Sequence, residues 1–211
     1  MTNILTLVLK TIPTISWTIA YILIIIKGFK DKTYGMPILA CLMNLSMEFH
    51  TFFNFSYDSF YYLGNIIWFL LDLIILYQII RFYPVKNKVQ FYSLGIIGFI
   101  IWSVVIQISL IIQSWIIFSA FFQNLIMSLL FIDFLKRDDF PKGQSLYIAL
   151  FRIIGTTSAV FVILTKDIFQ ILDLTTKILL LCIPICDIIY MYLFTIKKRK
   201  YKVCFEKKIN I

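Results

Sequence analysis

The stretch DKTYGMPILACLMNLSME, residues 31–48, decides the fold, because a short polar loop here leads into an apolar helix that contains a carboxylate. The segment from Asp31 to Pro37 combines charge, glycine and proline, which is typical of a loop. The residues from Ile38 to Met47 are uncharged, and Glu48 follows them. In a bilayer, a charge near the middle of a helix costs about 2.5 to 3.5 kcal/mol on insertion scales, so such a residue usually faces a bundle interior and has a function. Glu48 is therefore the first candidate functional residue.

The composition places this helix in a membrane protein. Of the 211 residues, 61% are hydrophobic and only 15% are charged, whereas about 25% of the residues of a soluble domain are charged. No Pro/Gly/Ser-rich linker divides the chain, so we expect a single transmembrane domain over residues 1–211. The net charge of +9 suits contact with an anionic leaflet of the lipid bilayer. It does not require a nucleic-acid partner.

Apolar runs separated by charged or turn-rich breaks give the number of helices. A spanning helix needs about 20 mostly apolar residues, and we expect an all-α integral membrane bundle of seven helices. The helices are expected at residues 11–26, 34–55, 61–82, 91–112, 115–135, 145–164 and 177–196, followed by a basic C-terminal tail at 197–211. The apolar segment Ile4 to Val8 either extends the first helix or lies along the interface. It does not resemble a cleaved signal, because positive charge before it and a small-residue cleavage site after it are missing.

Basic residues are distributed unevenly between the two ends of these helices. The loops after the first, third and fifth helices contain three Lys or Arg residues each and the tail contains seven, which makes 16 of the 20 basic residues. Loops rich in Lys and Arg stay in the cytoplasm. The N-terminus is therefore expected outside and the C-terminus in the cytoplasm.

Three carboxylates are expected at membrane depth, namely Glu48, Asp72 and Asp187 in the second, third and seventh helices. A rise of 1.5 Å per residue places them about 10 to 16 Å below the outer helix ends, so that all three can share one cavity. Each acid also has a polar or aromatic companion on its own helix face. The companions are Asn44 for Glu48, Asn65 and Trp68 for Asp72, and Tyr190 for Asp187.

These acids have two interpretations. They could serve only as interhelical hydrogen bonds, which are worth about 0.6 kcal/mol each in a bilayer. However, Arg152 is the one basic side chain expected at membrane depth, and we expect it to snorkel toward the cytoplasmic interface. A buried acid without a cation keeps its proton, whereas an acid paired with Arg152 would stay ionised and could not donate. The excess of acids favours a functional site, either for acid catalysis on an apolar substrate or for a proton relay in a transporter.

Neither a metal nor a cofactor is expected. The four cysteines form no CxxC pair and His50 is the one histidine, so we expect reduced packing cysteines and no ligand cluster. A prenyltransferase would need Asp-rich motifs for Mg²⁺ and diphosphate, but Asp138 and Asp139 lie in a basic loop. Without a Gly-rich phosphate loop, a nucleophile motif or a zinc signature, a metal-free acid mechanism is what remains.

A longer pattern surrounds the opening stretch. W-x3-Y-x6-G-x2-D-x2-YGMP-x2-A-x3-N-x3-E runs from Trp17 to Glu48. Further motifs follow in order: Trp68 with Asp72, the segment from Leu129 to Arg137, GQS at 143–145, Arg152 with Gly155 and Thr156, and D-x2-Y from Asp187 to Tyr190. In combination these residues resemble the membrane-bound terpene cyclases of fungal meroterpenoid pathways over most of the chain.

The resemblance implies an enzyme that cyclises a polyprenyl or meroterpenoid substrate, often an epoxide, with Glu48 and Asp187 as its two catalytic acids. We hypothesise that one of these acids protonates a terminal epoxide or alkene. The migrating cation would then be stabilised by aromatic faces in a cavity that excludes water. The residues expected to bind substrate or to support the acids are Asp72, Asn44, Trp17, Trp68, Tyr190 and Arg152.

The chain departs from the fungal pattern at Met47, where those proteins usually have an aromatic residue, and it is rich in Ile and Lys. We therefore expect a bacterial relative in the inner membrane, whereas a fungal protein would lie in the endoplasmic reticulum. The substrate of a bacterial relative need not be the same epoxidised compound.

A transporter or proton-coupled permease is the alternative to an enzyme. Such a protein would contain an internal repeat with matching broken helices, and the first and last three helices show no convincing duplication. A retinal-type receptor would need a lysine in the middle of the seventh helix, where this chain has Asp187.

Overall fold

The computed structural model describes residues 3–54, 59–84, 87–112, 115–165 and 168–209. Within these ranges all the regular elements are helices, which confirms the all-α class. The helices are α1 Asn3–Lys30, α2 Ile38–Asn54, α3 Ser59–Phe82, α4 Lys88–Ile111, α5 Trp115–Phe134, α6 Leu146–Leu164, α7 Ile168–Ile171 and α8 Leu174–Ile209. The short helix α7 was not expected from the sequence.

Six of the described helices, α1, α3, α4, α5, α6 and α8, are long and apolar enough to span a membrane. The protein is therefore a multi-pass integral membrane protein. Helix α2 is also apolar but has 17 residues, fewer than the roughly 20 that a full span needs. The seventh span, and the orientation of the bundle in the membrane, stay predictions.

Helix α2 is short because the loop before it enters the bundle. Tyr34 and Met36 are 6% and 0% exposed, so loop backbone occupies the space of the first helical turns. Pro37 also disfavours helical conformation in the residue that precedes it. The expected helix start at Tyr34 is therefore wrong, and the expected end at Phe55 lies outside the described residues.

The outermost helices are longer than expected. Helix α1 begins at Asn3 rather than at residue 11 and includes Pro13, which membrane helices tolerate when neighbouring groups satisfy the freed backbone. Helix α8 continues to Ile209, so the expected basic tail is helical as far as that residue. Lys and Arg are good helix formers, and this segment has no Gly or Pro to interrupt them.

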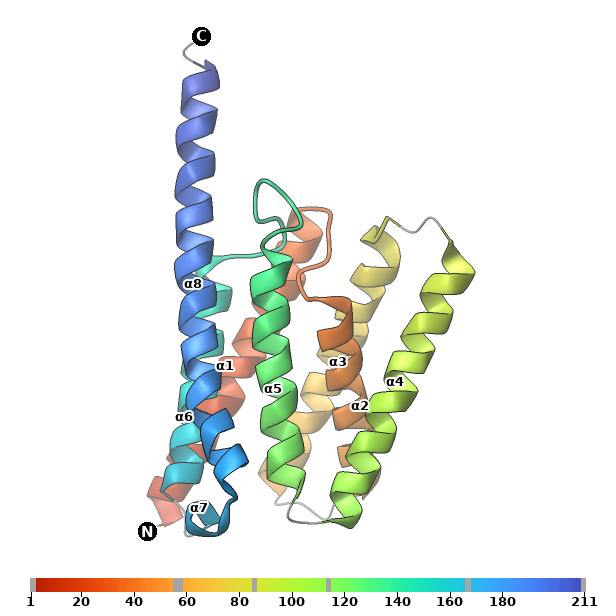
Figure 1. The fold of residues 1–211 in the computed structure, drawn as a ribbon, viewed down its shortest axis with the longest axis vertical. Coiled ribbons are helices and arrows are strands. Elements are labelled where there is room, and N and C mark those ends of the chain that lie inside the picture. The colour runs from red at the N-terminus through yellow and green to blue at the C-terminus, as the bar shows by residue number, and fades with distance from the viewer. Residues whose placement is uncertain (1–2, 55–58, 85–86, 113–114, 166–167, 210–211) are drawn as a thin grey trace.

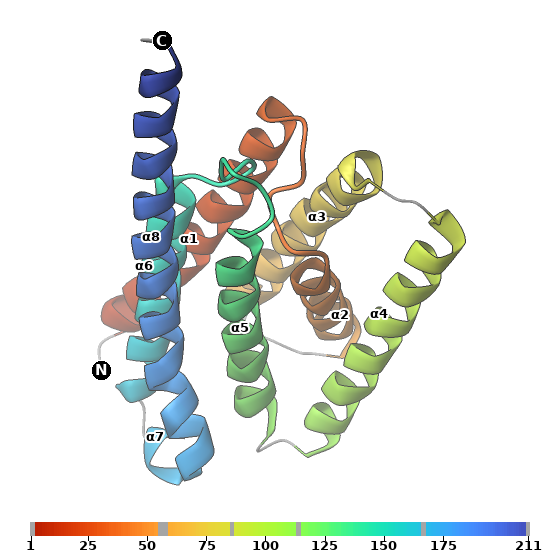
Figure 2. The same ribbon diagram turned by 45° about the horizontal axis from the view of Figure 1, so that its top comes forward.

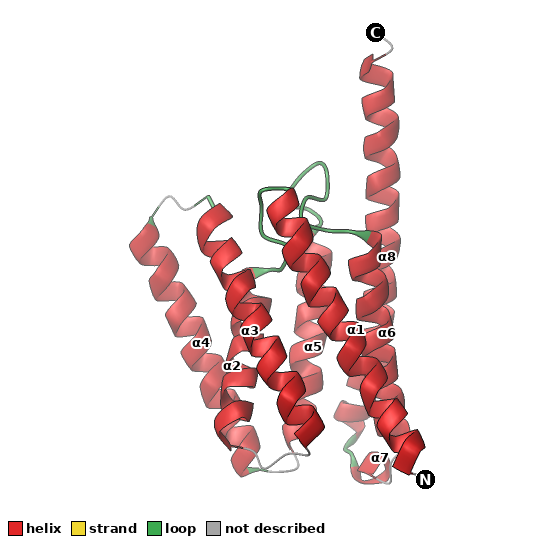
Figure 3. Ribbon diagram, turned by 180° about the vertical axis from the view of Figure 1, so that it is seen from behind, coloured by secondary structure: helices red, strands yellow, loops and turns green. Residues whose placement is uncertain are grey.

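The basic segments meet at one end of the bundle. Figure 1 shows the connections after α1, α3 and α5 at the same end as the C-terminus, while the N-terminus and α7 lie at the opposite end. Helix α2 packs against α3, α4 and α5, and Figure 2 shows it between them. Seen from behind, α1 crosses between α3 and α6 (Figure 3), and it contacts both.

Two loops fasten the basic end. Gly143 adopts a φ of 71°, a conformation that favours glycine, and its N–H donates to Asp31 Oδ2 over 2.8 Å. The Gln144 side chain donates to the carbonyl oxygen of Gly35 over 2.6 Å. Ser145 then caps α6 by accepting from the backbone N–H of Ile148. The YGMP and GQS motifs therefore hold the two loops together, away from the cavity described below.

Candidate active site

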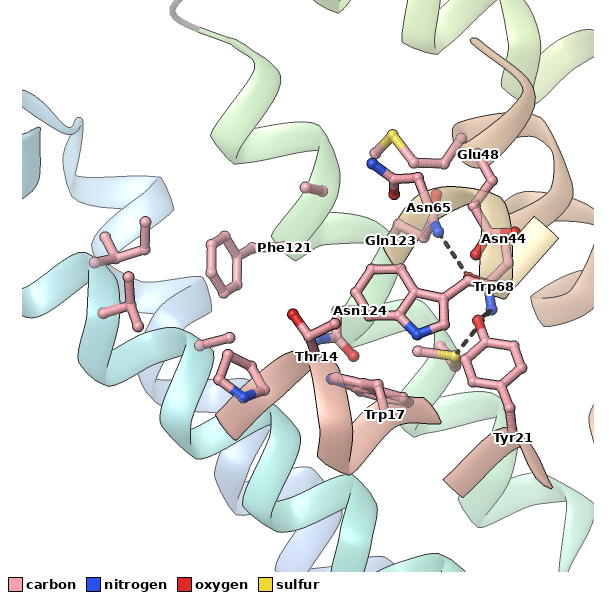
Figure 4. A pocket seen from close by; sticks show the side chains of 17 residues that line it. Thr14, Trp17, Tyr21, Asn44, Glu48, Asn65, Trp68, Phe121, Gln123 and Asn124 are labelled. Carbon is pink, nitrogen blue, oxygen red and sulfur yellow. Dashed lines mark hydrogen bonds between the residues drawn. The ribbon is translucent and has the colours of Figure 1, made fainter. Parts of the chain in front are cut away.

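A cavity of about 320 Å³ lies between α1, α2, α3, α5 and α6. Glu48, Asn44, Trp17 and Trp68 line it, as Figure 4 shows. The other side of the cavity is apolar and includes Phe121 from α5. Four of the residues expected from the sequence are therefore brought together around one cavity.

Glu48 is the acid that lines this cavity, although its side chain is only 5% exposed. It stands next to Asp72, which is fully buried behind the cavity wall. Glu48 Oε2 and Asp72 Oδ1 are buried without a hydrogen-bond partner. Neither acid belongs to an ion pair among the described residues. Two adjacent carboxyl groups in a low-dielectric interior resist being charged together, so this pair is suited to retain a proton.

A chain of hydrogen bonds with a fixed direction, the donor chain, ends at Asp72. It starts at the indole N–H of Trp102, which donates to Gln123 Oε1 over 2.6 Å. An indole nitrogen can only donate, so Gln123 must turn its amide nitrogen to Asn44 Oδ1, 2.8 Å away. Asn44 Nδ2 donates to the Tyr21 hydroxyl over 2.6 Å, and that hydroxyl donates to Asp72 Oδ2 over 3.3 Å. Because Asp72 accepts this last bond, the donor chain stabilises negative charge on Asp72.

Asp187 has a different partner. Its Oδ1 lies 2.8 Å from Arg152 Nη2, and both side chains are 0% exposed. Ser128 donates a further hydrogen bond of 2.7 Å to the same oxygen. The guanidinium carbon of Arg152 also lies 3.8 Å from the ring centroid of Phe131, a cation–π contact. The expectation that Arg152 snorkels to the interface is therefore wrong, because α5 and α8 offer it an aromatic face and a carboxylate inside the bundle.

Trp17 lies between the expected residues at the cavity and the expected residues behind its walls. Its ring lines the cavity and also lies 5.9 Å from the Arg152 guanidinium carbon. Trp68 is oriented by a hydrogen bond of 3.0 Å from its indole N–H to Thr18 Oγ1. Tyr190 is fully buried and donates to Gln144 Oε1. The structure thus places Glu48, Asn44, Trp17 and Trp68 at the cavity, and Asp72, Asp187, Arg152 and Tyr190 behind its walls.

Sequence reasoning missed three residues of the donor chain as parts of the site. Tyr21 was visible within the motif from Trp17 to Glu48, but no property of the sequence connected it to Asp72. Gln123 and Trp102 lie in apolar helices. The one available signal was an amide at membrane depth, because such a group must find a partner.

Comparisons with known proteins place the chain among membrane-bound terpene cyclases. The family model of the Pyr4-like transmembrane terpene cyclases matches residues 2–200. Asnovolin H synthase nvfL from Aspergillus novofumigatus is 32% identical over 75 residues, which are 35% of this chain and 31% of that protein. Terpene cyclase ascF from Acremonium egyptiacum is 34% identical over 67 residues, 32% of this chain and 24% of that protein. Terpene cyclase macJ from Penicillium terrestre is 33% identical over 80 residues, 36% of this chain and 30% of that protein.

The matched stretches therefore span less than a third of each relative's length. No solved structure matches the chain. The family model, by contrast, extends from the start of α1 into the basic part of α8 and so includes all the helices that surround the cavity. On this evidence, the chain belongs to the family of Pyr4-like transmembrane terpene cyclases.

Proposed function

We propose that the protein cyclises a polyprenyl or meroterpenoid substrate by an acid-initiated cation mechanism, with Glu48 as the proton donor. The observation that carries the proposal is the position of Glu48 in the wall of a largely apolar cavity, next to a second carboxyl group and to the rings of Trp17 and Trp68. Family membership supplies the reaction class. The geometry supports Glu48 as the acid.

Glu48 is a better donor than Asp187 for two reasons. Asp187 is paired with Arg152, so it serves the guanidinium as counterion and does not line the cavity. Glu48 instead shares its surroundings with Asp72, to which Tyr21 donates a hydrogen bond. The proton of the acidic pair then belongs on the carboxyl group that faces the cavity. We assign Asp72 the role of positioning residue and Asp187 the role of counterion to Arg152.

In the proposed reaction, the Glu48 carboxyl group gives its proton to a terminal alkene carbon or epoxide oxygen of the folded prenyl chain. Carbon–carbon bonds then form as each alkene attacks the cation before it. The faces of Trp17 and Trp68 attract the positive charge, and the apolar walls keep water away from it. The last cation loses a proton to the Glu48 carboxylate or to water. Substrate and product are therefore isomers.

The test uses membranes that contain the protein, supplied with farnesylated and geranylgeranylated substrates with and without an epoxide. Products of unchanged mass but new retention time are followed by mass spectrometry. We expect Glu48→Gln to lower product formation by about 100-fold or more, because a general acid contributes about 10² to 10⁴.

The matched control for this substitution is Asp133→Asn, which changes an acid that is 71% exposed on α5 and should keep full activity. Full cyclisation by the Glu48→Gln variant would refute the assignment. If the unaltered protein converted no prenylated substrate of either class, the proposed reaction itself would be wrong.

A further inference from the structure

A second hollow lies at the basic end of the molecule, between the last third of α8 and the loop before α6. This groove has a volume of about 470 Å³. Its apolar floor is formed by Phe140, Leu146 and Phe194, and Lys198, Arg199 and Lys202 stand on α8 beside it. The lining residues, all within the described part of the chain, include three cations and no carboxylate. The groove therefore combines an apolar floor with a positive rim.

The position of the groove along α8 corresponds to a membrane interface. Helix α8 begins at Leu174, and a hydrocarbon core of about 30 Å corresponds to about 20 helical residues. The core therefore ends near Phe194 if it starts at the first turn of α8. The headgroup layer adds a further few ångströms, about four or five residues, on each side. Lys198 and Arg199 then lie at the level of lipid phosphates, and Phe194 lies at the level of the first acyl carbons.

The local packing gives the groove a defined shape. The rings of Phe140 and Tyr201 lie with their centroids 4.8 Å apart, which fixes the α5–α6 loop against α8. Lys197, one turn before Tyr201, donates to the carbonyl oxygen of Leu135 just after α5, so a second contact attaches this part of α8 to the bundle. Lys198 and Arg199 are exposed. Their charges are therefore presented from a helix that is held in place rather than from a loose tail.

From this arrangement we infer that the groove is a binding site for one anionic phospholipid of the surrounding leaflet. Lys198 and Arg199 bind the phosphate group, with Arg199 offering two parallel N–H donors to its oxygens. The acyl chains lie along Phe194 and Leu146. Cations near an anionic leaflet attract its headgroups, and the apolar floor adds an acyl contact that a free phosphate ion cannot make.

The substrate of the cyclase is not the occupant. The cavity that contains Glu48 is lined by α1 residues between Pro13 and Tyr21 and by residues from the second half of α6, away from the basic end. Not one residue belongs to the lining of both hollows. The lipid site therefore stands independently of the proposed reaction, and its test needs no turnover.

The experiment measures lipid binding to the full chain in a neutral detergent by native mass spectrometry. Phosphatidylglycerol is titrated against phosphatidylcholine, with inorganic phosphate in a separate arm. The variant is the pair Lys198→Gln and Arg199→Gln. The matched control is Lys30→Gln with Lys88→Gln, which removes two exposed cations from the same end of the molecule but outside the groove.

We expect phosphatidylglycerol to bind tighter than phosphatidylcholine, and the groove variant to lose about tenfold or more in affinity for phosphatidylglycerol. The control pair should lose less than about twofold, since its charges act only through the general field. A photoactivatable phosphatidylglycerol should label the peptide that contains Phe140.

Three results would overturn the proposal. They are an equal loss in the control and the groove variant, equal binding of the two lipids, and displacement of phosphatidylglycerol by millimolar phosphate, which would indicate a site for soluble anions.

Discussion

Removal of the Asp187 charge should destabilise the protein strongly, whatever its effect on chemistry. In Asp187→Asn, Arg152 would keep its charge at 0% exposure and lose the negative charge that now lies 2.8 Å from its Nη2. Ser128 Oγ and the ring of Phe131 would stay beside the guanidinium, but neither carries a negative charge, and Arg152 Nε and Nη1 have no hydrogen-bond partner. Breaking a buried pair on one side costs about 3 to 5 kcal/mol. For a chain of this size that corresponds to a fall of roughly 6 to 20 °C in melting temperature.

A double replacement of the ion pair should restore the stability that Asp187→Asn loses. Replacing both partners, Arg152→Met with Asp187→Leu, leaves no buried charge without a partner. Such double replacements are often neutral or even stabilising by about 1 to 4 kcal/mol. The double variant should therefore melt well above the single variant and near the unaltered protein. If Asp187 is only a counterion, part of the cyclase activity should return with the fold.

The assay combines thermal unfolding in detergent, followed by size-exclusion chromatography of the heated protein, with product formation at a temperature where all variants stay folded. Glu48→Gln serves as the comparison, because it should lose activity while its melting temperature changes by only a few degrees. A melting temperature of Asp187→Asn within about 2 °C of that of the unaltered protein would contradict a stabilising role of the Arg152–Asp187 pair. The counterion role would also be contradicted if the well-folded double variant were as inactive as Glu48→Gln, since Asp187 would then have a direct chemical role.

Two further substitutions test the walls of the cavity. Gly155→Ala would place a Cβ atom 2.7 Å from Trp17 Cδ1. The indole must then shift toward the cavity, at a cost of about 1 to 3 kcal/mol. The product pattern or the rate should therefore change. Gly95→Ala is the control, because it meets no atom within 4 Å, and unchanged activity and stability in both variants would contradict the contact. Tyr21→Phe removes the final donor to Asp72 and the oxygen that accepts from Asn44 Nδ2, so we expect a loss of about 1 to 3 kcal/mol in stability or in catalytic free energy. An unfolding curve and a product rate that both match the unaltered protein would show that the donor chain has no energetic role.

Much of the architecture follows from the sequence because hydropathy alone determines where a chain can cross a bilayer. The expected bounds of the third, fifth and sixth helices agree with α3, α5 and α6 to within two residues. The start of α2 could not be predicted in the same way. Whether loop 31–37 remains at the surface or enters the bundle depends on contacts with residues 137–144, which are distant in the chain.

The site residues also divide into those that the sequence could predict and those that it could not. The depth of Glu48 and its companion Asn44 could be predicted from helical spacing, and both line the cavity. The partner of Arg152 could not be predicted from the sequence, because the depth of a residue along a helix does not tell which face of the helix is turned inward. Its long side chain could have reached the interface from its place in the second turn of α6. Only the packing of α5, α6 and α8 brings Phe131 and Asp187 against it.

The three buried acids differ in what balances each charge, and this difference argues for a division of roles. Asp187 has an arginine, whose guanidinium lies 2.8 Å from its carboxylate and balances its charge. Asp72 has the Tyr21 hydroxyl at the end of the donor chain, so it can accept negative charge without a cation. Glu48 has no ion-pair partner among the described residues, and its side chain borders the cavity. Of the three acids, Glu48 is therefore the one that both lacks an ion-pair partner among the described residues and can reach a substrate, which is why we propose it as the proton donor. In the proposed reaction, loss of the Glu48 proton leaves two adjacent carboxylates, and their repulsion favours return of the proton to Glu48 when the last cation is quenched.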